Sequence, residues 1–184
     1  MKLLIEKSDL LGCLGHTQGI VEKRTTIPIL SNILLKAGNG KLSITATDMD
    51  VEIIESVKAS VSQDGETTLP AHLLYDIVRK LPEGSQIELS GDEKGMKIRS
   101  GRSNFRVGCL PATDFPQMTN AENPAVFSLT AKNLKSLVDT TKFAISTEET
   151  RYYLNGIYLH SKDKGGIKVL RAVATDGHRL AMLE

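Results

Sequence analysis

The amino-acid sequence predicts an α+β fold in which helices pack on antiparallel β-sheets. Two observations lead to this prediction. A pattern of one strand, one helix and three strands occurs almost three times along the 184 residues. The tripeptide Ala46-Thr47-Asp48 also recurs as Ala174-Thr175-Asp176 at the same place in its unit. Two units would make one domain with two helices on one face of antiparallel sheet, so we expect one complete domain and half of the next.

The first unit opens with a short strand at 2–6, and Ser8-Asp9 is the expected N-cap of the helix that follows. The apolar face of this helix consists of Leu10, Leu11, Leu14 and Val21. After Pro28, strands are expected at 29–36, 42–47 and 51–57. Asn39-Gly40 predicts a hairpin turn between the first two of these strands.

The second unit begins at residues 67–69, with Pro70 at the first helical position. The apolar face of its helix consists of Leu73, Leu74, Ile77, Val78 and Leu81. Pro82 and Gly84 end this helix, and strands are expected at 86–90, 96–100 and 104–109.

The third unit is expected to begin with a strand at 126–129 and to continue with a helix at about 130–145. Its strands are expected at 152–160, 167–174 and 179–183. Prolines at 111, 116 and 124 indicate a linker before this unit. We therefore expect a first domain at 1–112, a linker at 113–124 and the first half of a second domain at 125–184.

Composition is that of an ordinary globular chain, with 40% hydrophobic and 24% charged residues. No apolar run approaches the roughly 20 residues that span a bilayer. The first residues are broken by charge too early for a signal peptide, so the cytoplasm is the expected location. Cys13 and Cys109 lie far apart without a Cys-x-x-Cys spacing, which suggests neither a zinc site nor a disulfide. The net charge of +1 lacks the basic excess usual for nucleic-acid modules, although segregated charges could still give a positive surface.

A series of short motifs occurs in a fixed order along nearly the whole chain. In the first part they are Thr-Ile-Pro-Ile-Leu-Ser-Asn at 26–32, Leu-Pro-Glu-Gly at 81–84, Arg-Ser-Gly-Arg-Ser at 99–103, Leu-Pro-Ala at 110–112 and Asp-Phe-Pro at 114–116. The most specific are Arg-Tyr-Tyr-Leu-Asn-Gly at 151–156 and Ala-Thr-Asp-Gly-His-Arg-Leu-Ala at 174–181. In this order and spacing, the motifs make the chain resemble the bacterial DNA polymerase beta sliding clamp family.

This resemblance implies a DNA clamp fold of three similar domains, of which the second is truncated here and the third is absent. It implies that two full-length copies form a homodimeric ring around duplex DNA. It also implies a noncatalytic function, in which the clamp tethers the replicative DNA polymerase and other replication or repair proteins to DNA and gives processivity. Implied partners are duplex DNA, bound without sequence preference, and the polymerase and clamp loader, which dock through short peptide motifs. No cofactor, metal or membrane is implied, and the expected location is the cytoplasm, in association with the nucleoid.

The resemblance implies DNA contacts on helices of the inner ring wall and on nearby loops. The candidate DNA-binding residues are Arg24, Arg79, Lys132, Lys135, Lys142, Tyr152 and Tyr153. The three lysines share one side of the third helix, opposite Leu134, Leu137, Val138 and Ile145, and Asp139 interrupts them. Without the resemblance, such a stripe is more often a solvated face, and Arg79 could equally complement its helix dipole. The two tyrosines would point to opposite faces of a strand, so one could pack in the core, and Glu148-Glu149 should repel phosphate nearby.

The resemblance also implies a groove that binds a short partner peptide ending in hydrophobic residues. Its candidate residues are Arg151, Tyr153, Leu154, Thr175, Gly177, His178, Arg179 and Leu180. An apolar floor suits leucine and phenylalanine side chains, and Gly177 allows close approach of a peptide backbone. Ring closure is assigned to an edge strand around Phe105 and Val107.

Two other functions stay open from the residues alone. Asp176 and His178 could form the acid/base pair of a hydrolase, although no Gly-x-Ser-x-Gly motif accompanies them. Asp48, Asp50 and Glu52 alternate along an expected strand and could hold magnesium, although such carboxylates are more often a solvated strand edge. A metal- or histidine-dependent phosphoesterase is therefore the alternative to a clamp.

Overall fold

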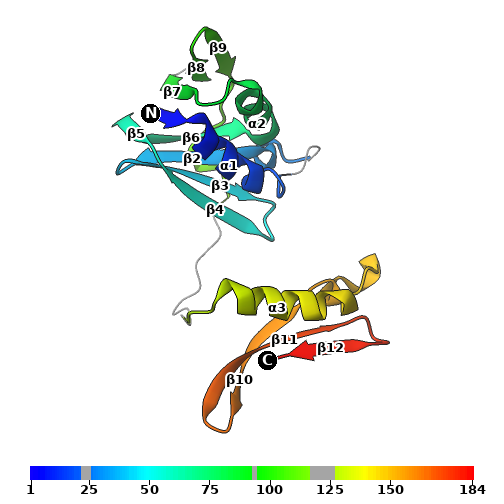
Figure 1. Cartoon of the computed structure of the whole chain (residues 1–184). Coiled ribbons are helices and arrows are strands. Elements are labelled where there is room, and N and C mark those ends of the chain that lie inside the picture. Colours follow the sequence, from blue (N-terminus) through cyan, green and yellow to red (C-terminus); the bar gives the residue numbers. More distant parts are fainter. Residues whose placement is uncertain (22–25, 93–94, 117–126) are drawn as a thin grey trace. The chain divides into compact units, whose positions relative to one another are not determined.

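The chain forms two compact units, residues 1–120 and 121–184 (Figure 1). The computed structural model describes residues 1–21, 26–92, 95–116 and 127–184. Within these ranges, no helix combines the length and the apolar character needed to cross a membrane. Helices and antiparallel strands occur together in both units, which confirms the predicted α+β class.

The first unit contains two antiparallel sheets. One has the strand order β5-β1-β7-β8-β9, with the strands β5 (Ser60–Gln63), β1 (Lys2–Glu6), β7 (Gln86–Asp92), β8 (Gly95–Ser100) and β9 (Ser103–Val107). The other has the order β4-β3-β2-β6, with the strands β4 (Glu52–Lys58), β3 (Lys41–Thr47), β2 (Asn32–Gly38) and β6 (Gly65–Pro70). Asn39 and Gly40 have φ values of 51° and 70° between β2 and β3, which confirms the predicted hairpin turn.

Two helices, α1 (Lys7–Thr17) and α2 (Ala71–Lys80), pack against each other in this unit. Leu10 and Leu14 of α1 and Leu74 and Val78 of α2 are buried in a core shared with both sheets. The predicted apolar faces are therefore largely right. Leu73 is an exception, because it is 48% exposed, and Val21 and Leu81 are buried but lie beyond the ends of the two helices.

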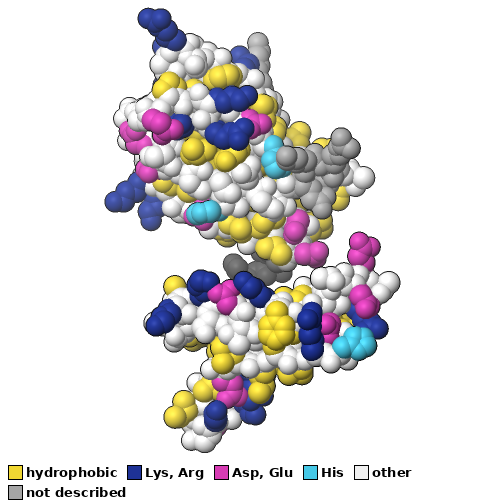
Figure 2. Space-filling view, turned by 45° about the vertical axis from the view of Figure 1, so that its right-hand side comes forward, with side chains coloured by type: hydrophobic (Ala, Val, Ile, Leu, Met, Phe, Trp, Pro, Cys, Tyr) yellow, Lys and Arg dark blue, Asp and Glu magenta, His cyan; other side chains and the backbone are white. Residues whose placement is uncertain are grey.

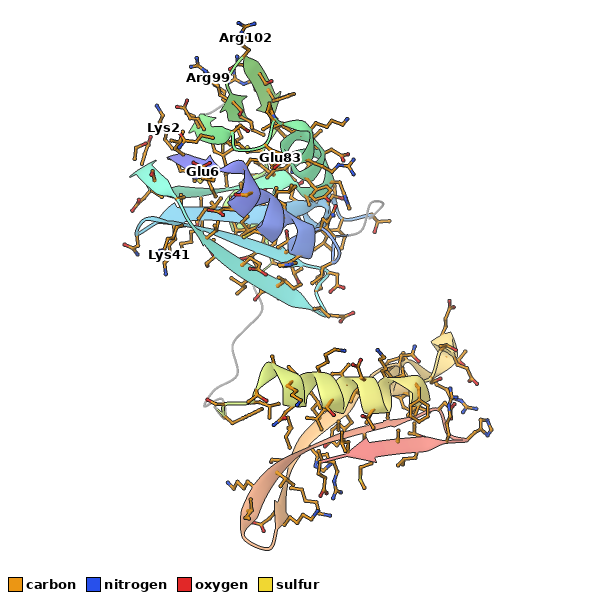
Figure 3. All side chains as sticks on the ribbon, in the orientation of Figure 1. Lys2, Glu6, Lys41, Glu83, Arg99 and Arg102 are labelled. Atoms are coloured by element: carbon orange, nitrogen blue, oxygen red, sulfur yellow. The ribbon has the colours of Figure 1, made fainter. Side chains whose placement is uncertain are left out.

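The predicted N-cap of α1 at Ser8-Asp9 is wrong. The helix begins at Lys7, and its N-cap residue Glu6 makes no side-chain capping bond. The start is fixed instead by contacts with the chain after α2, since the Lys7 amide donates to the carbonyl oxygen of Ser85 (2.9 Å). The buried Lys7 ammonium also pairs with Glu83, which Figure 3 labels in this region. Local capping signals could not reveal this long-range anchor.

Two further boundaries in the first unit differ from the prediction. Residues 29–31, expected to begin a strand, belong to a 3-10 helix (Pro28–Ser31) in which the Leu30 amide donates to the carbonyl oxygen of Ile27 (3.0 Å). Pro70 ends β6 and stands at the N-cap of α2, one position before its expected place. Residues 112–115, at the predicted end of the domain, include a short 3-10 helix (Ala112–Asp114) followed by the buried Phe115. The predicted boundaries at 112 and 125 stay predictions.

In the described residues of the second unit, 127–184, one α-helix packs on a three-stranded antiparallel sheet (Figure 1). Helix α3 (Ala131–Thr141) packs against β11 (Ile167–Thr175) and β12 (Leu180–Leu183). The third strand is β10 (Tyr158–Lys164), which pairs with β11. Thr130 caps α3, because its hydroxyl oxygen accepts a hydrogen bond from the Asn133 amide (3.2 Å).

The second unit departs from the prediction at three places. Residues 127–130 form no strand in the described structure, whereas β1, at the corresponding place in the first unit, pairs with β5 and β7. The helix ends at Thr141 and continues as a 3-10 turn (Lys142–Ala144). The strand expected to begin at residue 152 begins later, as β10 at Tyr158, because Glu149–Leu154 form a 3-10 segment.

Candidate functional site

The turn at residues 175–179, which joins β11 to β12, carries much of the predicted peptide groove. The Thr175 hydroxyl donates to the carbonyl oxygen of Arg179 (2.7 Å) and accepts from the Gly177 amide (3.1 Å). The Asp176 carboxylate accepts from the backbone amides of His178 and Arg179, both at 2.9 Å. These bonds lie within the turn and fix its backbone.

The same contacts set the electrostatics of the turn. The backbone amides of Arg179 and His178 hold the pKa of Asp176 below its ordinary value, and an ion pair with Arg179 contributes (Asp176 Oδ2 to Arg179 Nε, 2.8 Å). The Arg179 guanidinium also lies 5.7 Å from the centre of the Phe143 ring, which is a cation–π distance. Asp176 therefore acts as a structural anion, and Arg179 is oriented from two sides.

Gly177 has a backbone conformation that favours glycine. Its φ is 91°, and a Cβ at this position would lie 3.2 Å from Arg151 Nη1. Arg151 in turn donates from Nη1 to the carbonyl oxygen of Asp176 at 3.5 Å, the long end of hydrogen-bond distances. The structure thus brings Arg151 and Gly177 together, as the groove prediction requires.

Arg151 lies in the 3-10 segment, with non-helical angles (φ −112°, ψ 46°), and its Nε pairs with Glu148 Oε2 at 3.1 Å. The Arg151 amide donates to the carbonyl oxygen of Glu148 (3.1 Å). These contacts hold Arg151 within its own segment, and its bond to Asp176 connects that segment with the turn at 175–179.

Tyr152 and Tyr153 are both on the surface, with exposed fractions of 79% and 71%. Their rings meet edge to face, with centroids 5.9 Å apart. The expected placement on opposite faces of a strand is wrong, because the segment is a 3-10 turn in which the Asn155 amide donates to the carbonyl oxygen of Tyr152 (3.1 Å). Both rings are therefore available for contact with a ligand.

Among the remaining groove residues, Leu180 is 64% exposed, His178 is exposed and Leu154 is half-buried. The hydrolase alternative required the His178 imidazole to hydrogen-bond the Asp176 carboxylate. The described structure contains no such bond, and the carboxylate is already engaged by two backbone amides and Arg179. The arrangement offers peptide-binding groups, and the acid/base pair is not assembled.

The lysines predicted on the third helix are exposed, but two of them are paired with the same carboxylate. Asp139 pairs with Lys135 and with Lys142, the latter at 2.7 Å. Hydrogen bonds from Lys135 and then Lys142 lower the pKa of Asp139 to about 2. Lys132 is exposed and forms no ion pair in the described part of the chain. Figure 2 shows basic, acidic and hydrophobic side chains interspersed on the visible face of the second unit.

The other predicted DNA contacts lie in the first unit. Arg79 is paired with Asp76 (3.2 Å) and lies 5.6 Å from the centre of the Tyr75 ring. Arg24 lies outside the described residues. Arg79 is therefore held by side chains of its own helix.

The predicted ring interface lies on β9, which is an edge strand of its sheet. Phe105 is 39% exposed, whereas the Val107 side chain is buried in the core of the first unit. Figure 3 shows Arg99 and Arg102 at this end of the unit.

The magnesium alternative fails on backbone geometry. Asp48 and Asp50 lie in a turn and only Glu52 lies in a strand, because the Asp48 carboxylate accepts from the amides of Asp50 (3.0 Å) and Val51 (2.7 Å). Within the described ranges, no group of three or more His, Cys, Asp or Glu side chains is placed to hold a metal ion.

Sequence reasoning missed one residue of the site, Phe143, and one pairing, that of Glu148 with Arg151. Phe143 lies under Arg179, and Glu148 holds Arg151. The spacing of three residues between Glu148 and Arg151 was a usable signal for the ion pair, whereas no local signal pairs Phe143 with Arg179.

Comparison with known proteins gives consistent matches along the chain. The family model for the DNA polymerase III beta subunit, N-terminal domain, matches residues 1–119, and the model for its central domain matches residues 128–184. The beta sliding clamp of Caulobacter vibrioides is 54% identical over 186 residues, and that of Escherichia coli K12 is 39% identical over 183 residues. These alignments cover 100% and 99% of the chain and 50% and 49% of the relatives.

Solved structures agree with this result and with the predicted clamp fold. The pol III beta structure of Caulobacter crescentus matches with a TM-score of 0.92 at 54% identity, covering 99% of the chain and 49% of that structure. A sliding clamp from Bartonella birtlesii, bound to griselimycin, matches with a TM-score of 0.92 at 50% identity, again over 99% and 49% of the two chains. The chain thus spans about half the length of these relatives. It belongs to the DNA polymerase III beta subunit family, whose N-terminal and central domains it matches.

Proposed function

We propose that this chain is part of a sliding clamp that holds a DNA polymerase on duplex DNA and catalyses no reaction itself. The observation that supports this most strongly is the fold of both units, which resembles that of a clamp structure over 99% of the chain at 54% sequence identity. The proposed assembly is a homodimeric ring of the full-length protein, working in the cytoplasm with the nucleoid. Its first clamp domain is proposed at 1–112, followed by a linker at 113–124 and the start of the second domain at 125–184.

The proposed DNA surface uses basic and aromatic side chains that contact phosphate and sugar without reading bases. It comprises Arg24, Arg79, Lys132, Lys135, Lys142, Tyr152 and Tyr153. The exposure of both tyrosines supports this proposal, and the pairing of Lys135 and Lys142 with Asp139 weakens their part in it. Lys132 is then the strongest single candidate on α3.

The proposed peptide groove is supported by the fixed turn at 175–179 and by the apolar side chain of Leu180, which stands exposed beside it. A short peptide ending in leucine or phenylalanine would bury its apolar side chains against Leu154 and Leu180, gaining roughly 25 cal/mol per Å² removed from water. We propose that griselimycin binds in the same groove, since a clamp with 50% sequence identity to this chain binds that compound.

Ring closure is proposed at β9, where an edge strand offers unpaired backbone groups to a partner strand. Phe105 would contribute its exposed ring, and Val107 would contribute its backbone only, since its side chain is in the core.

DNA binding is tested with a labelled duplex and the intact protein. Affinity should not depend on sequence, and its logarithm should fall linearly with the logarithm of salt concentration. Lys132→Gln should reduce the salt slope by about 1, whereas Lys162→Gln, which removes an exposed charge from β10, should not. A strong preference for one base sequence, or equal slopes for the two variants, contradicts the proposal.

Peptide binding is tested with a fluorescent hexapeptide ending in Leu-Phe. Tyr153→Ala should weaken binding, whereas Tyr158→Ala, which removes an equally exposed tyrosine from β10, should not. The phosphoesterase alternative predicts instead that the protein hydrolyses p-nitrophenyl phosphate and that His178→Ala abolishes this turnover. Such turnover would replace the clamp proposal.

A further inference from the structure

Glu148 lies at the start of a segment that carries residues of both proposed sites. It stands at the start of the 3-10 segment that carries Tyr152, and its carboxylate pairs with Arg151 (Oε2 to Nε, 3.1 Å). The side chains of the two partners are 53% and 42% exposed, so solvent and salt screen this pair.

The backbone holds Glu148 in place. Its amide donates to the Ser146 hydroxyl (3.2 Å), and its carbonyl oxygen accepts from the Arg151 amide (3.1 Å). With its amide group oriented to satisfy these neighbours, the Asn155 side chain donates to the carbonyl oxygens of Ser146 (2.9 Å) and Glu148 (3.3 Å). The carboxylate is therefore presented from a fixed segment.

The guanidinium of Arg151 also reaches the turn at 175–179. Its Nη1 donates to the carbonyl oxygen of Asp176 at 3.5 Å and occupies the space beside Gly177. Because Nε faces Glu148 while Nη1 faces the turn, one guanidinium bridges the 3-10 segment and the groove. At 3.5 Å the contact with Asp176 is weak by itself, so the position of Arg151 depends on the stronger ion pair with Glu148.

We propose that Glu148 is a positioning residue for the peptide groove, acting through Arg151, and that the same carboxylate lowers the affinity of the neighbouring surface for DNA. The inference rests on the proposed function, because it assigns both sites as proposed above. Its first part follows from the bridge just described. Its second part follows from Coulomb repulsion, since a carboxylate at the start of the segment that carries Tyr152 disfavours an approaching phosphate.

The Glu148 carboxylate should therefore strengthen peptide binding and weaken DNA binding. Glu148→Gln keeps the size of the side chain and removes its charge. It should weaken binding of the hexapeptide ending in Leu-Phe by roughly two- to fivefold, the effect of losing one exposed ion pair. It should also strengthen binding of a labelled duplex at low salt, and this gain should shrink as salt is raised.

Glu149→Gln is the matched control. Glu149 is the next residue, is exposed, and makes no ion pair in the described structure. Its neutralisation removes the same charge from the same segment, so DNA binding should strengthen while peptide affinity stays at the wild-type value. A third variant, Glu148→Asp, keeps the charge and should restore part of the peptide affinity lost in Glu148→Gln.

The two proposals fail in different ways. If wild-type protein binds the hexapeptide and Glu148→Gln binds it equally well, the positioning role is wrong and the proposed function stands. If Glu148→Gln and Glu149→Gln weaken peptide binding equally, the effect is one of general charge, and the role of Arg151 is again wrong. If wild-type protein binds neither hexapeptide nor duplex, both proposals are overturned. Thermal melting of each variant checks that the exposed substitutions leave the fold intact.

Discussion

Thr47 and Thr175 make the same pair of hydrogen bonds in the two units. The Thr47 hydroxyl donates to the carbonyl oxygen of Val51 (2.9 Å) and accepts from the Met49 amide (3.0 Å). Thr175 bonds Arg179 and Gly177 in the same way, and each threonine is followed by an aspartate that accepts two backbone amides. The repeated Ala-Thr-Asp tripeptide therefore encodes a repeated turn, which in the second unit carries part of the proposed peptide groove.

Replacing Met49 with glycine should be neutral or stabilising. The turn requires a positive φ at its third residue, where Gly177 has 91° and Met49 has 81°. A side chain on a residue with such a φ destabilises the folded state by about 1–2 kcal/mol. Removing it relieves this strain, but the greater conformational entropy of glycine in the unfolded state offsets about 0.5–1 kcal/mol of the gain. Met49→Gly should therefore raise the free energy of unfolding by about 0–1.5 kcal/mol in urea titrations. Met49→Ala retains a Cβ and should give no such gain, and equal effects of the two would contradict the explanation.

Replacing Gly177 with alanine should damage the groove through the backbone. Arg151 Nη1 is the end of a flexible side chain and can shift, so the positive φ causes most of the cost, about 1–2 kcal/mol. We expect weaker hexapeptide binding and lower stability of the second unit by hydrogen exchange. The control is Gly156→Ala, because Gly156 has no positive φ and no atom within 4 Å of a Cβ built there. An equal loss of hexapeptide affinity in Gly177→Ala and Gly156→Ala would show that the positive φ is not the cause.

The fold was predictable wherever the signal was local. Alternation and turn residues predicted the hairpin at Asn39-Gly40, and helical spacing predicted the buried faces of α1 and α2. Errors occurred where distant contacts decide the structure and where a segment departs from its own propensity. The start of α1 is set by Ser85 and Glu83, and the segment around Tyr152 is a 3-10 turn although its residues favour a strand.

The sequence predicted which residues form the candidate site better than it predicted their contacts. The repeated tripeptide marked the turn around Asp176, but periodicity cannot indicate that this carboxylate binds backbone amides rather than His178. Helical spacing placed Asp139 among the lysines, yet only side-chain positions reveal that it neutralises two of them.

The ion pair and amide contacts of Asp176 predict an acid-dependent turn. Its folded pKa lies below the ordinary value, so the turn gains stability above the unfolded pKa of about 3.9 and loses it as pH falls through the folded pKa. The carboxyl signal of Asp176 in NMR titration should therefore have its midpoint below about 3.9. Asp176→Asn keeps an oxygen acceptor for the amides but loses the ion pair, and its stability should vary less with pH in this range. A midpoint at or above 3.9 would show that the amide bonds do not persist in solution.

Replacing Asp139 with asparagine should strengthen DNA binding if α3 faces duplex DNA. The carboxylate is ionised at neutral pH, since Lys135 and Lys142 lower its pKa to about 2, and it occupies both ammonium groups. Asp139→Asn releases these lysines for phosphate, so affinity for a labelled duplex at low salt should rise about two- to fivefold, and the salt slope should steepen by about 1. Asp163→Asn is the control, because it changes net charge equally but alters an aspartate that accepts from the Gly166 amide in the β10–β11 hairpin. An equal rise in both variants would mean that net charge is the cause, and no rise in Asp139→Asn would remove α3 from the proposed DNA surface.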